Sequence, residues 1–223
     1  MTVLHLADEG EAADLAAFLS RLLHYDRGAA VRLQASGTAL AVFGRPPSFE
    51  VLAVRAVRLA KPYEDGLDDA LDVTVSAGEL LEAVAEKAAT AAVPRAVTGP
   101  PWAGVLPPRG GWRAEPGLPA LDDLRALVAA GIAEFRARTG ELGAERRTRA
   151  EFDRIGGDIW SRTVAGTRLP VRVVHAAQSL GFLRGEGGLA LVSSGAWLRL
   201  RTPYGSVAVR RAGSGTLGIS PAR

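Results

Sequence analysis

Residues 189–211 read LALVSSGAWLRLRTPYGSVAVRR, and this stretch decides the fold of the C-terminal half. Three runs of strand-forming residues are separated by turn signals at Ser194-Gly195 and at residues 202–205. Consecutive strands joined by short turns pair in antiparallel fashion. The sequence therefore predicts a three-stranded meander, with strands Leu189–Ser193, Trp197–Arg201 and Ser206–Arg211.

The middle strand of this meander has two different faces. Side chains alternate between the faces of a strand, so Leu198 and Leu200 point one way. Trp197, Arg199 and Arg201 point the other way, together with Arg210 of the last strand. We expect the leucines to join a core and the arginines to lie on the opposite face.

The N-terminal residues predict a second antiparallel sheet with two helices. A short strand at residues 2–6 precedes a helix from Glu11 to His24, whose leucines recur at helical spacing. Three strands follow between residues 31 and 59, and a fourth from Leu71 to Val75. Ser76 and Glu79 form a capping box that starts a second helix, expected to run to about Ala91.

Residues 94–119 are rich in proline and glycine and contain Trp102 and Trp112. A freely flexible linker gains nothing from two tryptophans. We therefore expect an ordered connector that packs on a domain surface, with room for one short strand.

Three helices are expected between the connector and the meander. The last of them opens at Pro170 and closes at Gly181, a residue typical of helix C-termini. The fold class is α+β, and the helices with the meander resemble a winged helix at best. The expected division is an N-terminal lobe (1–93), a connector (94–119), a C-terminal helical lobe with the meander (120–212) and a flexible tail (213–223). The helices are Asp122–Arg138, Arg147–Arg162 and Pro170–Leu180.

The charge is distributed unevenly along the chain. Residues 1–117 carry 11 basic and 15 acidic side chains, whereas residues 118–223 carry 16 arginines and 9 acids. Residues 160–223 hold nine arginines and one acid, Glu186. A GC-rich genome explains the abundance of arginine but not the loss of acids from one end. Such asymmetry points to an anionic partner.

Familiar catalytic and cofactor motifs are missing. The chain has no cysteine, which excludes disulfides, thiolate zinc sites and a cysteine nucleophile. Gly213, Gly215 and Gly218 match a dinucleotide fingerprint, but too few residues follow to form its helix. The acidic residues of 64–72 lack the register of a calcium loop, so a solvated loop is expected. We predict no catalytic residue, no cofactor and no metal site.

The candidate binding residues lie on the arginine-bearing face of the meander. They could contact nucleic acid through charge and stacking, or bind another acidic partner. Alternatively the arginines solubilise the sheet or pair with the acidic N-terminal half. The apolar character of residues 170–180, which carry Arg172 as their basic residue among valines, argues against a recognition helix. His175 is expected to be a packing or surface residue and not a catalytic one. The set is Trp197, Arg199, Arg201, Arg210 and Arg211.

Two segments resemble the ending shared by a family of uncharacterised proteins from high-GC actinobacteria: HAAQSLGFL (175–183) and GAWLRLRTPYGSVAVRR (195–211). The resemblance covers about a fifth of the chain. The resemblance implies a common lineage and does not indicate an activity. The matching residues are Leu180, Gly181, Phe182, Leu183, Gly195, Trp197, Arg199, Leu200, Gly205, Val207 and Arg210.

The function predicted first is a non-enzymatic interaction or regulatory protein of the cytoplasm, with a protein partner. The N-terminus does not resemble a signal peptide, and no stretch is apolar enough for a membrane span. A nucleic-acid-binding protein is the second hypothesis, and an enzyme with a site assembled from scattered residues is the third. The sequence does not define an oligomeric state.

Overall fold

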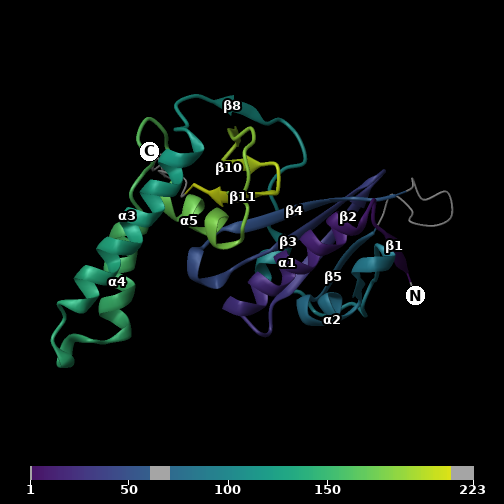
Figure 1. The fold of residues 1–223 in the computed structure, drawn as a ribbon, viewed down its shortest axis with the longest axis horizontal. Coiled ribbons are helices and arrows are strands. Elements are labelled where there is room, and N and C mark those ends of the chain that lie inside the picture. The colour runs from purple at the N-terminus through teal and green to yellow at the C-terminus, as the bar shows by residue number, and fades with distance from the viewer. Residues whose placement is uncertain (1, 61–70, 212–223) are drawn as a thin grey trace, which may run out of the picture.

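The computed structural model describes residues 2–60 and 71–211, which form the predicted α+β fold. An eight-stranded antiparallel sheet is the main layer, and its core face is covered by helices (Figure 1). Short 3-10 turns join the elements at Pro47–Phe49, Glu86–Ala88, Pro101–Gly104 and Ala144–Arg146.

The large sheet draws four strands from each half of the chain. The halves meet where β4 pairs with β11, with Ala53 opposite Val207. Local patterns predicted a separate sheet in each lobe, whereas the structure joins the strands of both lobes into one eight-stranded sheet. A separate sheet in each lobe would leave the backbone groups of both edges unpaired, and pairing satisfies them. The strand order is β5 (Asp72–Ser76), β2 (Ala30–Ser36), β3 (Ala39–Gly44), β4 (Leu52–Arg58), β11 (Gly205–Arg210), β10 (Trp197–Thr202), β9 (Ala190–Ser194) and β8 (Arg113–Glu115).

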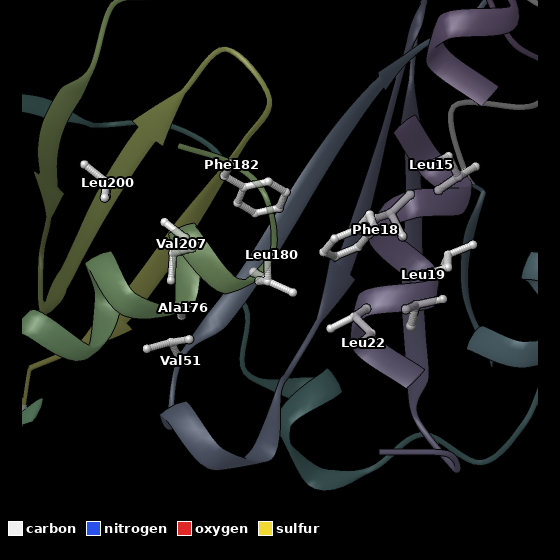
Figure 2. Packing of buried hydrophobic residues seen from close by; sticks show 14 of the residues in the cluster. Leu15, Phe18, Leu19, Leu22, Val51, Ala176, Leu180, Phe182, Leu200 and Val207 are labelled. Atoms are coloured by element: carbon white, nitrogen blue, oxygen red, sulfur yellow. The ribbon is translucent and has the colours of Figure 1, made fainter. Parts of the chain in front are cut away.

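The main core lies between this sheet and two helices, α1 (Glu9–Tyr25) and α5 (Val171–Ser179). Phe18 of α1 stacks on Phe182, which follows α5, with ring centroids 5.6 Å apart (Figure 2). The two halves therefore share a hydrophobic core as well as a sheet.

A second, three-stranded sheet corrects one prediction. The helix expected to reach Ala91 ends early, as α2 (Ala77–Glu82), and the next residues form strands. Leu4 pairs with Ala91, and both are fully buried. Burial against the N-terminal strand thus outweighs the helix propensity of an alanine-rich segment. The strand order is β1 (Val3–His5), β7 (Thr90–Ala92) and β6 (Val84–Ala85).

The C-terminal helices follow the prediction closely. Helices α3 (Leu121–Gly140) and α4 (Arg149–Trp160) form a hairpin that projects from the body (Figure 1). Helix α5 ends at Ser179 and is capped by Leu180. Gly181 follows with a φ of 74°, and the Phe182 amide donates to the Ala177 carbonyl at 2.8 Å.

The proline-rich connector crosses the sheet face opposite the core, which we call the outer face. Trp102 and Leu106 pack against a small apolar cluster formed by Phe43, Leu52 and Val54. The connector then enters the sheet as its edge strand, β8. It is ordered, as its tryptophans predicted.

Two stretches that the sequence singled out lie outside the described residues. They are the acidic run Glu64, Asp65, Asp68 and Asp69, and the glycine motif at residues 213–218. Across residues 2–60 and 71–211, no helix has the length and apolar character that a bilayer crossing requires.

Candidate functional site

The pairing of β10 with β11 places the candidate binding residues on one face of the sheet, as the alternation along β10 predicted. Leu198 pairs with Val209 and Leu200 with Val207, and all four side chains are buried on the core face. The intervening residues point to the outer face. There Trp197 lies opposite Arg210, Arg199 opposite Ala208, and Arg201 opposite Ser206.

Arg199 occupies the centre of this face and is half-buried. Its Nε donates to the Ser206 hydroxyl at 2.8 Å, and its guanidinium carbon lies 5.5 Å from the centroid of the Trp112 ring. Burial, with a smaller contribution from the neighbouring charge of Arg201, lowers the pKa of Arg199. An uncompensated positive charge is therefore held in a partly desolvated position.

The other arginines surround this centre. Arg201 and Arg210 are exposed, and neither forms an ion pair or side-chain hydrogen bond with any described residue. The Nη2 of Arg211 donates to the Gly195 carbonyl at 2.6 Å, which fixes the side chain at the turn between β9 and β10. We call Trp112, Trp197, Arg199, Arg201, Arg210 and Arg211 the arginine face.

Other arginines of the basic segment are already paired with acids. Arg162 bonds Glu134 at 2.6 Å, Arg168 bonds Glu115 at 3.1 Å, and Arg184 pairs with Asp14. The basic segment thus divides into arginines used in folding and arginines without a carboxylate partner. Arg199, Arg201 and Arg210 belong to the second group, whereas Arg211 interacts electrostatically with Glu115, whose pKa it helps to lower.

Three acidic residues of α1 and its N-cap, Asp8, Glu11 and Asp14, form ion pairs away from the arginine face. Arg55, whose side chain is 6% exposed, contacts Glu11 at 2.8 Å and Asp14 at 3.2 Å. Arg58 bonds Glu11 and Asp8, and Arg184 supplies the link from the C-terminal lobe. Among the described residues, no N-terminal acid pairs with the arginine face.

Sequence reasoning missed two members of this arrangement. Trp112 was expected to order the connector, and the structure also places it against Arg199. Ser206 is 4% exposed and orients the same guanidinium. In the sequence, the only indication that Trp112 belongs to the site is its presence in a proline-rich segment. The cross-strand register could have indicated Ser206, because it places Ser206 on the same face as Arg199.

Helix α5 packs as core, as its valines predicted. Val171, Val173 and Val174 are buried, and His175 lies against Trp160 with ring centroids 4.1 Å apart. Phe49 contacts the same imidazole edge-on at 4.9 Å. Burial lowers the pKa of His175 to about 4.

A shallow hollow of about 500 Å³ lies on the helix side, between α3 and the end of α5. Ala126, Ala129 and Leu183 line it, with Arg125 at its rim. The Arg125 guanidinium is already bound to the Leu183 carbonyl at 2.6 Å. Nowhere in residues 2–60 and 71–211 do three His, Asp or Glu side chains gather as a metal site.

Two family models match the chain, one for each half. Residues 1–104 match a domain of unknown function (DUF8010), and residues 107–214 match a second domain of unknown function (DUF8185). No curated protein matches the sequence. These findings agree with the resemblance to an uncharacterised family.

The fold is similar to that of DNA polymerase sliding clamps. Two structures of the Pseudomonas aeruginosa clamp, one of them with ligand, superpose with a TM-score of 0.50 at 14% sequence identity. They cover 90% and 95% of this chain, which in turn spans 63% and 64% of the clamp chains. The likeness is one of fold.

Proposed function

Starting from a chain of two domains of unknown function in a clamp-like α+β fold, we propose that it is a non-enzymatic interaction protein of the cytoplasm. Its partner-binding surface is the arginine face, and its partner carries negative charge. The similar solved structures are those of a DNA polymerase sliding clamp. That likeness supports an interaction role.

One observation carries the proposal. Among residues 2–60 and 71–211, Arg201 and Arg210 are exposed and have no carboxylate partner, while Arg162, Arg168 and Arg184 of the same segment are paired. Like charges on one face repel each other. An anion bound there relieves this repulsion and provides charge-assisted hydrogen bonds to the guanidiniums.

Retention on immobilised heparin, a general polyanion, tests the proposal. We expect the Arg201→Glu/Arg210→Glu variant to elute at a clearly lower salt concentration than the unmodified protein. The matched control is Arg27→Glu/Arg136→Glu, which changes the net charge equally at two exposed arginines outside the arginine face. An equal shift for both variants would mean that only net charge matters, and the proposal would then be wrong.

A further inference from the structure

We propose that the arginine face binds single-stranded nucleic acid, with the phosphates contacting Arg201 and Arg210 and a base stacking beside Trp197. This inference rests on the proposed function and names the partner of the same site. It is carried by the aromatic rings, the unpaired guanidiniums and their spacing on the sheet.

The face combines aromatic and cationic side chains. Trp197 and Arg210 are cross-strand neighbours, and Trp112 lies 5.5 Å from the guanidinium carbon of Arg199. Proteins that bind single strands pair a positive surface with aromatic rings, because every base offers a face for stacking. An acidic peptide would use the arginines and leave the indoles without a role.

The spacing of the charges favours a repeating polyanion. Arg199 and Arg201 are two residues apart on one strand, so their backbone positions are separated by about 7 Å. Arg210 pairs with Trp197, four residues from Arg201, so the backbone positions of Arg201 and Arg210 are about 14 Å apart along the strands and one small anion would contact only part of the set. A chain of phosphates can contact several of these guanidiniums in turn, and each guanidinium can donate two hydrogen bonds to one phosphate.

The structure favours a single strand over a duplex. Duplex readers insert a helix or a two-stranded ribbon into the major groove. Helix α5 is packed into the core, and β10 and β11 lie inside an eight-stranded sheet between β9 and β4. Within residues 2–60 and 71–211, the arginines of the face lie on or directly after strands of this sheet and not on an isolated helix or hairpin. The exposed side chains Arg201 and Arg210, beside the connector, suit contact with an unpaired strand.

The experiment measures fluorescence anisotropy of a labelled twelve-residue thymidine oligonucleotide titrated with the full chain. An abasic oligomer with the same number of phosphates and a polyglutamate peptide of equal length serve as comparison ligands. We expect the thymidine oligomer to bind about tenfold more tightly than the abasic oligomer, because stacking contributes to affinity. Raising salt from 50 mM to 200 mM should weaken binding roughly tenfold, as a few phosphate contacts predict.

Variants then assign the contacts. Arg201→Glu/Arg210→Glu, at two exposed positions, should reduce thymidine-oligomer affinity at least about tenfold, whereas Arg27→Glu/Arg136→Glu should reduce it far less. Trp197→Ala should weaken the thymidine oligomer and leave the abasic oligomer unchanged. Circular dichroism confirms that each variant is folded.

The outcomes separate the two proposals. Equal affinity for the thymidine and abasic oligomers, or tighter binding of polyglutamate, would overturn the nucleic-acid inference and leave the anionic-partner proposal standing. No binding to any of the three ligands at low salt would overturn both. Loss of thymidine binding in the control variant as large as in Arg201→Glu/Arg210→Glu would show that the arginine face is not the site.

Discussion

The guanidinium of Arg55 donates to the backbone carbonyl of Tyr204 across 2.8 Å, which joins β4 to the turn between β10 and β11. The other Nη atom contacts Glu11 at 2.8 Å. One buried side chain thus connects the first helix, the central strand and the C-terminal hairpin. The hydrogen bond to Tyr204 links the two halves beside the shared sheet, and the ion pair with Glu11 holds the Arg55 side chain in place.

Replacing Arg55 with methionine should destabilise the fold by about 3 kcal/mol, because it removes the donor to the Tyr204 carbonyl and leaves the largely buried Glu11 with the exposed Arg58 as its remaining ion-pair partner. Urea unfolding measures the loss. Arg58→Met is the matched control, since Arg58 also bonds Glu11 but is 70% exposed. A loss for Arg58→Met as large as for Arg55→Met would contradict the role given to Arg55.

Two glycines of the α3–α4 hairpin should respond to alanine in opposite ways. A methyl group at Gly131 would lie 2.7 Å from Cζ3 of Trp160, which cannot move freely because it stacks on His175. Overpacking of this kind costs about 1 to 3 kcal/mol, more than the gain in helix propensity.

Gly157 has nothing within 4 Å, so Gly157→Ala should stabilise by up to about 1 kcal/mol. Thermal unfolding of both variants checks this, and the same sign for both would refute it.

The half-buried His175 should make stability depend on pH. Burial lowers its pKa from 6.5 to about 4. Between these two pH values the imidazole is therefore mostly protonated in the unfolded chain and mostly neutral in the folded protein. Its contribution is therefore complete above pH 6.5 and decreases as the pH falls from 6.5 towards 4. Urea unfolding between pH 7.5 and pH 4.5 should show a steeper loss for the unmodified protein than for His175→Gln. Parallel curves would show that His175 does not titrate in this way.

Trp102 should be required to keep the outer face covered. Trp102→Ala removes the ring that packs on Phe43, Leu52 and Val54 and should cost about 2 kcal/mol, because the side chain is only partly buried. The uncovered cluster should also bind the dye ANS more strongly. Val105→Ala, at a residue 49% exposed in the same connector, should do neither. Unchanged stability and dye binding in Trp102→Ala would mean that the connector does not depend on this contact.

Local patterns were enough to predict most elements and the two faces of β10. Alternation along a single strand placed Leu198 in the core and Arg199 on the outer face, since a strand's period depends only on nearest neighbours. The glycine cap after α5 was predicted for the same reason, because a turn to positive φ is a local demand.

Contacts between segments that are distant in the sequence could not be predicted from such local patterns. Nothing near Ala53 indicates that it pairs with Val207, and nothing near Trp112 indicates that it meets Arg199. The same limit explains the missed strands after α2, where the partner that decides their conformation is the N-terminal strand. The positions of these arginines on the outer face could therefore be predicted from sequence, whereas the absence of a carboxylate partner for Arg201 and Arg210 among the described residues needed the structure.

The pairing of β4 with β11 has a consequence for how the chain can be divided. Two family models split the sequence near residue 105, yet a cut there leaves each fragment with a bare strand edge and half of the Phe18–Phe182 contact. Bare edges recruit complementary strands. The fragments 1–104 and 105–223, produced together, should therefore associate into the complete fold without a covalent link.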